Sequence, residues 1–327
     1  MSYASITGWG KYLPERVMKN SELEQMVDTS DEWIMTRTGI HERRIVGDTE
    51  ATSTMAVVAG QRALEVAGLS PTDLDLVILA TCSPDRLVPA SAAYVQSAIG
   101  ATKAAAFDAM AGCSGSIYAL VTAYQYIASG AYKNVLVVGS ESLTRMIDWS
   151  DRSTCVLFGD GAGALVVQAN NKSTDMLSFV LGNDGSGADK LYAPGPCGKR
   201  IDTTSNGHYY LRMEGSEVFR FAVNTLVESS KQVVKAAGLE IADIDLFIPH
   251  QSNQRITLAA MKTLNFPMEK VFVNLDRYGN LSAASAMVAL CEAVEQGRLK
   301  AGDLVTLVAF GAGLSWGATV LRWQPPQ

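Results

Sequence analysis

The stretch that decides the fold is "LEVAGLSPTDLDLVILATCS" at 64–83, because it returns as "VKAAGLEIADIDLFIPHQSN" at 234–253. Each copy has the pattern of a helix end, an AGL turn, an acidic turn and an apolar strand. Self-similarity at a fixed spacing indicates an internal duplication. The identical pairs, all 170 residues apart, are Ala67/Ala237, Gly68/Gly238, Leu69/Leu239, Asp73/Asp243, Asp75/Asp245, Leu76/Leu246 and Ile78/Ile248.

A second repeated segment supports the duplication. "GCSGSIYALVTAYQYIASGAYK" at 112–133 matches "GNLSAASAMVALCEAVEQGRLK" at 279–300 with an offset of 167 residues, so the second copy has a small net deletion. The sequence predicts two related α/β halves, 1–170 and 171–327. A chance match between two generic α/β patterns is the alternative, because apolar strands are easily matched.

Short apolar runs between longer helical patterns indicate a layered architecture. Runs this apolar are typical of strands covered on both faces, which predicts mixed sheets with helices on each side. The stretch 183–210, rich in Gly, Pro and polar residues, predicts a long loop or lid. The strand candidates are "DLVILAT" at 75–81, "NVLVVGS" at 134–140, "GALVVQA" at 163–169, "DLFIPH" at 245–250 and "DLVTLVAFG" at 303–311.

Composition narrows the class of protein. The 327 residues, 48% hydrophobic and 18% charged, are typical of a globular protein with a large core. A net charge of -6 argues against a nucleic-acid partner. The N-terminus lacks a secretory signal pattern and no window has 18 uninterrupted apolar residues, so we expect a cytoplasmic protein without a membrane segment. The cysteines form no CxxC pair and predict neither a disulfide framework nor a metal site; they are Cys82, Cys113, Cys155, Cys197 and Cys291.

Three residues are candidates for one site. The repeat places Cys113 opposite Asn280, each after a glycine and before a helical pattern, and His250 ends an apolar strand. In two-fold related halves, such strand ends and helix starts can converge. A helix N-terminus favours a thiolate, so we expect a lowered pKa for Cys113. The alternatives are a buried structural cysteine, a hydrogen-bonded core histidine and an asparagine helix cap.

The glycine-rich stretch "FGDGAGALVV" at 158–167 invites comparison with a nucleotide-binding loop. Its glycines lead into a strand pattern, whereas a phosphate loop leads into a helix whose N-terminus holds the anion. We interpret the stretch as structural, with close backbone packing or a tight hairpin.

Over nearly its whole length the chain resembles the β-ketoacyl-acyl carrier protein synthase III family of the thiolase superfamily. The resemblance implies a thiolase-like, duplicated, five-layered α/β/α/β/α fold with two pseudo-two-fold related halves, normally a homodimer, that needs no cofactor besides its CoA thioester substrates. The matching stretches are "DTSDEWIMTRTGIHERR" (28–44), "AGCSGSIYAL" (111–120), "DRSTCVLFGDGAGA" (151–164), "PHQSNQRI" (249–256), "DRYGNLSAAS" (276–285) and "FGAGLSWGA" (310–318).

The resemblance also implies the chemistry. Cys113 would accept the acyl group of an acyl-CoA, His250 and Asn280 would complete a Cys-His-Asn triad, and the backbone N–H groups of Cys113 and Ala312 would form an oxyanion hole. Malonyl-acyl carrier protein would then lose CO2 and attack the acyl-cysteine. This is the decarboxylating Claisen condensation that initiates fatty acid synthesis.

Further positions follow from the same resemblance. Arg220, Arg255 and Lys262 would dock the acidic carrier protein, although a solvated helix face explains them nearly as well. Thr29 and Glu32 also have capping-box spacing, and Trp33 could belong to the core. The residues implied to bind CoA and its pantetheine arm are Thr29, Trp33, Arg37, Arg152, Gly215, Phe219, Ser252 and Asn253.

Two departures from acetyl-using relatives bear on the acyl pocket. Ser116 and Val88 stand where such relatives often place bulky aromatic residues, so we hypothesise a wider pocket that accepts primers that are branched or longer than acetyl. Other functions stay open: a ketosynthase or acyltransferase of a secondary-metabolite pathway, a cysteine hydrolase, or a non-catalytic CoA- or carrier-binding scaffold.

Overall fold

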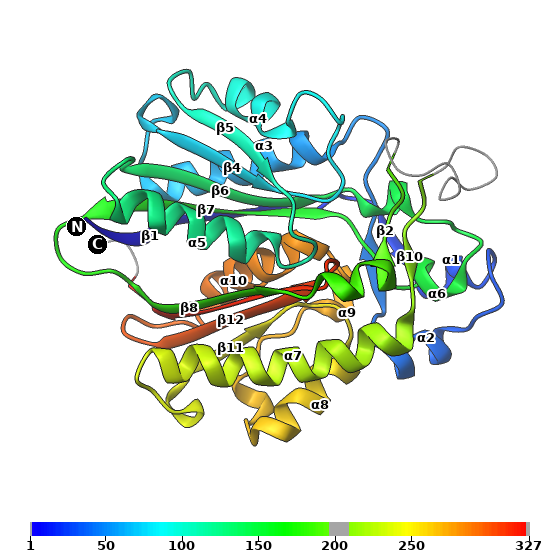
Figure 1. Ribbon diagram of the computed structural model, residues 1–327. Helices are drawn as coiled ribbons and strands as arrows, with labels where there is room; N and C mark the ends of the chain where they lie inside the picture. The colour runs from blue at the N-terminus through cyan, green and yellow to red at the C-terminus, as the bar shows by residue number, and fades with distance from the viewer. Residues whose placement is uncertain (1, 196–208, 325–327) are drawn as a thin grey trace.

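Two β-sheets and three layers of helices alternate in the computed structural model, which describes residues 2–195 and 209–324. Figure 1 shows the five layers in the order α/β/α/β/α. The predicted fold class is confirmed. Cys197 and His208, and the part of the predicted 183–210 loop at 196–208, lie outside the described residues.

The first sheet has the strand order β1-β7-β6-β4-β5. β4 runs parallel to β5 and β6, whereas β7 runs antiparallel to β6 and β1. All five β4 residues are buried because helices cover both faces, which explains the unbroken apolar run. The strand bounds are β1 (Tyr3–Tyr12), β4 (Leu76–Ala80), β5 (Ala105–Ala109), β6 (Asn134–Glu141) and β7 (Gly161–Asn170).

The second sheet repeats this order and these directions as β8-β13-β12-β11. An isolated parallel bridge between Phe247 and Val271 lies where β5 pairs with β4 in the first sheet. The described strands of the first sheet all precede residue 171 and those of the second all follow it, which supports the division at residue 170. The bounds are β8 (Met176–Asn183), β11 (Leu246–Pro249), β12 (Leu304–Gly311) and β13 (Ser315–Arg322).

Helices form the outer and central layers. α3 (Thr52–Ala67) and α4 (Ser91–Ile99) cover the first sheet, and α7 (Gly215–Ala236) with α8 (Gln254–Leu264) cover the second. α5 (Gly115–Ala128) and α10 (Ser285–Glu295) lie between the sheets and contact both. A helix packed on both sides needs apolar or small residues around its circumference, and the first nine residues of α10 are all buried.

The central helices carry the repeat into three dimensions. The 3-10 turn η7 (Ser282–Ala284) leads directly into α10, so Cys113 and Asn280 each stand two residues before a helical segment. The glycines before them, Gly112 and Gly279, both have left-handed backbones with φ of 56° and 68°. Both residues therefore enter their helices through the same kind of turn.

The shorter elements surround one end of the central layer. β2 pairs with β3 and β9 pairs with β10. None of the helices in residues 2–195 and 209–324 combines the length and apolar character that a membrane span requires. The bounds are β2 (Val17–Lys19), β3 (Glu42–Arg44), β9 (Leu191–Tyr192), β10 (Arg212–Met213), α1 (Asn20–Leu23), α2 (Asp31–Thr38), α6 (Arg152–Cys155), α9 (Leu275–Tyr278), η1 (Pro71–Asp73), η2 (Leu143–Met146), η3 (Gly185–Lys190), η5 (Ile241–Asp243) and η6 (Met268–Lys270).

Candidate active site

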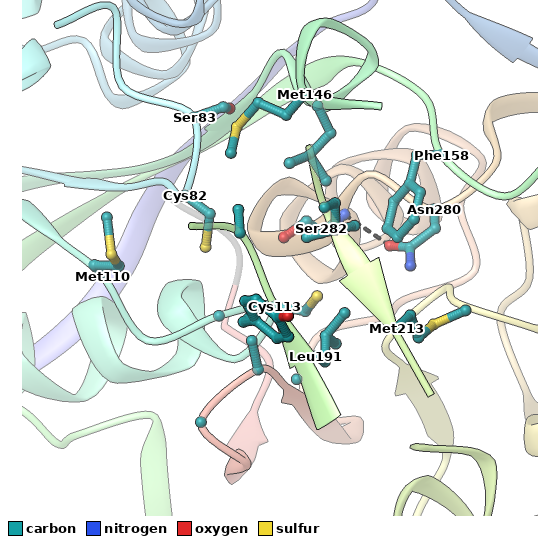
Figure 2. Close-up of a pocket in the computed structure, with 18 of the residues that line it drawn as sticks. Cys82, Ser83, Met110, Cys113, Met146, Phe158, Leu191, Met213, Asn280 and Ser282 are labelled. Carbon is teal, nitrogen blue, oxygen red and sulfur yellow. Dashed lines mark hydrogen bonds between the residues drawn. The ribbon is translucent and has the colours of Figure 1, made fainter. Parts of the chain in front are cut away.

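A cavity of about 1160 Å³ brings the three candidate residues together. Cys113, His250 and Asn280 all line it, although 137 and 30 residues of chain separate successive members (250 - 113 and 280 - 250). Much of the remaining wall is apolar, and Figure 2 shows Met110, Met146, Met213 and Leu191 around Cys113. A concave, mostly apolar cavity with a few polar groups is typical of a small-molecule site.

Cys113 lies between the start of α5 and the turn after β12. A Cβ at Gly311 would lie 2.4 Å from the Cys113 backbone nitrogen, and one at Gly112 would lie 2.6 Å from the Ala312 carbonyl oxygen. Only glycines allow the two backbones to approach this closely. The turn at 311–313 is thus held directly against the candidate nucleophile.

The expected lowering of the Cys113 pKa is wrong. Burial raises the pKa of this thiol to about 12, while the Ser282 hydroxyl and the Cys113 N–H oppose the rise and the Glu141 carboxylate adds to it. The side chain is 8% exposed, so a thiolate would lose most of its hydration. Cys113 therefore holds its proton at neutral pH until a reaction removes it.

His250 follows β11 and is buried against the central layer. Its Nδ1 lies 2.6 Å from the Ser285 hydroxyl oxygen, and its ring meets the edge of Phe310 at a centroid distance of 5.2 Å. Burial lowers the pKa of His250 to about 3, so the ring is neutral at physiological pH. Its other nitrogen, Nε2, is left for the cavity.

Asn280 presents its amide nitrogen to the same cavity. Its Oδ1 accepts a hydrogen bond from the Ser282 N–H at 2.8 Å, and Figure 2 shows the amide oxygen turned to Ser282 with the nitrogen on the opposite side. Asn280 is not the N-cap of α10, which is Ala284, so the helix-cap alternative is wrong.

The position of Ala312 suits an oxyanion hole. The Ala312 N–H donates to no backbone oxygen among the described residues, and Ala312 lines the cavity beside Cys113. The Cys113 N–H is directed at its own sulfur. Two backbone donors therefore adjoin the sulfur, in the arrangement that stabilises a developing oxyanion.

Four of the predicted CoA-binding residues line the outer part of the cavity, namely Gly215, Phe219, Ser252 and Asn253. The Ser252 hydroxyl is buried without a hydrogen-bond partner, which leaves it free for a ligand. Asn253 has a second role as the N-cap of α8, where its Oδ1 accepts from the Arg255 N–H.

The remaining CoA-binding candidates gather on α2 and α6. The guanidinium carbons of Arg37 and Arg152 each lie 4.8 Å from the centre of the Trp33 ring, so two cations already occupy the space beside the indole. Ser30 and not Thr29 caps α2, so the capping-box alternative is wrong. The Thr29 hydroxyl is buried without a partner.

The three basic candidates lie exposed on the outer helices. Arg255 packs its guanidinium carbon 5.6 Å from the centre of the Phe219 ring, and Arg220 forms an ion pair with Glu217 at 3.3 Å. Arg220 is on α7, whereas Arg255 and Lys262 are on α8, which packs against α7. They flank the cavity wall that Phe219 contributes.

The two acyl-pocket candidates do not line the cavity of this single chain. Ser116 is fully buried on α5 with its hydroxyl unpartnered, behind the wall that Cys113 forms. Val88 is 83% exposed beside Leu87 at 71%, with Met110, also a lining residue, at 70%. Only the last two contribute to the cavity wall.

Several site residues have no signal in the sequence that we recognised. The buried Glu141 accepts hydrogen bonds from Cys82 N–H and from the Ser83 N–H and hydroxyl, and burial raises its pKa. Ser282 has φ of 47°, unusual for a residue with a side chain, and its hydroxyl faces the thiols of Cys82 and Cys113. Serine is too common for sequence to single out such positions.

The glycine-rich stretch and the metal prediction can be read from the same region. "GDGAGALVV" forms the start of β7, where a Cβ at Gly163 would lie 2.7 Å from the Val288 nitrogen, so its glycines serve close packing. Within the described part of the chain, no group of three or more His, Cys, Asp or Glu residues has a metal-binding arrangement.

A duplicated five-layered fold with cysteine, histidine and asparagine on one cavity defines a thiolase-fold acyltransferase. Two family descriptions match: 3-oxoacyl-[acyl-carrier-protein (ACP)] synthase III at residues 107–185 and its C-terminal region at 234–323. A beta-ketoacyl-[acyl-carrier-protein] synthase III of Roseiflexus sp. is 52% identical and covers 98% of this chain and 99% of its own.

Solved structures agree. The 3-oxoacyl-[acyl-carrier-protein] synthase III of Aquifex aeolicus is 48% identical with a TM-score of 0.92, covering 98% of this chain and 100% of its own. A priming β-ketosynthase of the R1128 polyketide pathway is 36% identical with a TM-score of 0.94, covering 99% and 97%. The chain belongs to the β-ketoacyl-[acyl-carrier-protein] synthase III family, the condensing enzymes that initiate fatty acid synthesis.

Proposed function

We propose that the protein condenses an acyl-CoA primer with malonyl-acyl carrier protein through an acyl-cysteine on Cys113. The observation that carries the proposal is the single cavity on which Cys113 meets two N–H donors, those of His250 and Asn280. Family membership supplies the reaction class, and the geometry supplies a role for each side chain. The catalytic group is Cys113, His250 and Asn280, with the oxyanion hole at the N–H groups of Cys113 and Ala312.

In the first half-reaction the Cys113 sulfur attacks the thioester carbonyl of the acyl-CoA. The S–C bond to CoA breaks, CoA leaves as a thiol, and the proton lost by Cys113 balances the one that CoA takes up. Negative charge develops on the carbonyl oxygen and is held by the two backbone N–H groups. Because burial raises the pKa of Cys113 to about 12, proton loss accompanies the attack and does not precede it.

In the second half-reaction the malonyl group loses CO2. The electron pair of the broken C–C bond forms an enolate, whose oxygen accepts hydrogen bonds from His250 Nε2–H and Asn280 Nδ2–H. The enolate carbon attacks the acyl-cysteine carbonyl, the C–S bond breaks, and the Cys113 sulfur takes up a proton. A neutral histidine suits this role, since burial lowers the pKa of His250 to about 3.

The substrates and partners follow from the family and from the cavity's outer end. CoA would lie along Gly215, Phe219, Ser252 and Asn253, with its nucleotide near Thr29, Trp33, Arg37 and Arg152. Because Arg152 covers the Trp33 ring, an adenine stacked there would have to displace it. Arg220, Arg255 and Lys262 would dock the acidic carrier protein. We expect a cytoplasmic enzyme that needs no cofactor.

A homodimer would cover the exposed apolar residues beside the cavity. Leu87, Val88 and Met110 are each at least 70% exposed, which is unusual for a cluster of large apolar side chains. A partner's Val88 position could then close the acyl end of the cavity. Because valine is smaller than the aromatic residue of acetyl-using relatives, the enzyme would accept branched or longer primers.

Product formation from purified components tests the proposal. The wild-type protein, incubated with acetyl-, isobutyryl- or octanoyl-CoA and malonyl-acyl carrier protein, should yield β-ketoacyl-acyl carrier protein, and Cys113→Ala should yield none. Release of free acid without malonyl-acyl carrier protein would instead indicate a cysteine hydrolase. A strong preference for acetyl-CoA would refute the primer hypothesis, and a different acceptor would favour a secondary-metabolite enzyme.

A further inference from the structure

The two ring nitrogens of His250 have different surroundings. Nδ1 lies 2.6 Å from the Oγ of Ser285, the first residue of α10, which is 1% exposed. The ring is fixed from a second side by Phe310, whose plane meets it at 77°. The imidazole therefore cannot exchange its two nitrogens by rotation without breaking both contacts.

The direction of the hydrogen bond between Ser285 and His250 sets the position of the ring proton. The Gln251 N–H donates to Ser285 Oγ at 3.4 Å, so this oxygen already accepts one hydrogen bond. Among the described residues, its own hydrogen has no acceptor other than His250 Nδ1. Reversing the bond would leave a buried hydroxyl donor unsatisfied, which folded proteins avoid. Ser285 therefore donates, and the single proton of the neutral ring resides on Nε2.

Asn280 is oriented by the same segment. The Ser282 N–H occupies the Asn280 Oδ1, and the Ser285 hydroxyl occupies the His250 Nδ1. Both acceptor atoms are thereby turned away from the cavity, and both donor groups are turned toward it. One turn of chain, 282–285, thus prepares the two side chains in the same sense.

We propose that Ser285 is a positioning residue that holds His250 as the Nε2–H tautomer and so restricts it to hydrogen-bond donation in the malonyl half-reaction. The inference rests on the proposed function and deepens it. An Nε2 that already carries a proton cannot accept another from Cys113 without forming a buried cation. Acylation of Cys113 therefore proceeds without His250 as a base, and Ser285 separates the requirements of the two half-reactions.

The half-reactions of Ser285→Ala test this assignment. Acylation of Cys113 by acyl-CoA is timed by intact-protein mass, and condensation by β-ketoacyl product formed from the preloaded acyl-enzyme. We expect acylation near the wild-type rate and condensation slower by about 10-fold to 100-fold, the usual loss when the residue that orients a functional histidine is removed. Ser285→Cys, which keeps a weak donor, should recover part of the condensation rate. Ser230→Ala, which also loses a buried hydroxyl, is the matched control on α7.

A second measurement reads the tautomer directly in the wild-type enzyme. The chain has three histidines, so 15N-labelled histidine gives a simple spectrum in which His250→Gln identifies the His250 signals. A proton on Nε2 supports the inference, whereas a proton on Nδ1 overturns it, even if Ser285→Ala does not fold. Equal slowing of both half-reactions, or of neither, also overturns it. Failure of the proposed function would differ, because wild-type protein would then form no acyl adduct or no product.

Discussion

The contact between Gly311 and Cys113 predicts a specific cost for one methyl group. In Gly311→Ala the new Cβ would lie 2.4 Å from the Cys113 nitrogen and 2.9 Å from the Cys113 Cβ, whereas ordinary contact begins at 3.4 Å. The backbone beside the nucleophile must therefore move by about 1 Å (3.4 - 2.4). A shift of this size in a reacting group costs about 100-fold in rate. Crowding of this kind also costs about 1–3 kcal/mol in the free energy of unfolding.

The acylation rate of Cys113 is the assay, followed by intact-protein mass after mixing with acyl-CoA, with thermal unfolding measured in parallel. Gly185→Ala is the matched control, because that glycine is exposed and its Cβ would meet nothing closer than 3.9 Å. We expect Gly311→Ala to acylate about 100-fold more slowly while the control is unchanged. A Gly311→Ala protein with wild-type stability and wild-type acylation would refute the packing argument.

Three further predictions concern the site. His250→Ala and Asn280→Ala should each slow condensation by about 100-fold to 1,000-fold while acyl-CoA still labels Cys113; equal loss of labelling would contradict the division of roles. Alkylation of Cys113 by iodoacetamide should rise about tenfold per pH unit from about pH 7 to pH 10, because the thiolate fraction grows throughout that range when burial holds the pKa at about 12. A plateau near pH 8 would show that the helix start lowers the pKa instead. Trp33→Ala should raise KM for acyl-CoA but not for an acyl-pantetheine that lacks the nucleotide, and equal effects on both would place the nucleotide elsewhere.

The repeat made much of the fold predictable. The five apolar runs correspond to β4, β6, β7, β11 and β12, since strands covered on both faces keep an unbroken apolar pattern. We did not anticipate β1, whose buried positions alternate with partly exposed ones and include Gly8 and Gly10. An alternation of period two was present there, but glycine weakens a strand pattern.

The candidate site was predictable to a different extent. Cys113 and Asn280 could be paired from the repeat because equivalent turns precede equivalent helices. The pKa of Cys113 could not be predicted, because burial depends on walls that come from distant segments. Ser285 could not be singled out either, because its role exists only through contact with a histidine 35 residues earlier in the chain.

The central claim is that one cysteine carries the acyl group between two substrates. Single-turnover mass spectrometry tests it most directly: the wild-type protein is acylated with isobutyryl-CoA, freed of excess substrate and mixed with malonyl-acyl carrier protein. The account predicts an adduct on Cys113 that persists alone and disappears after mixing, with one β-ketoacyl-acyl carrier protein formed per adduct lost. Product formation without an adduct on Cys113, or an adduct that malonyl-acyl carrier protein leaves in place, would contradict it.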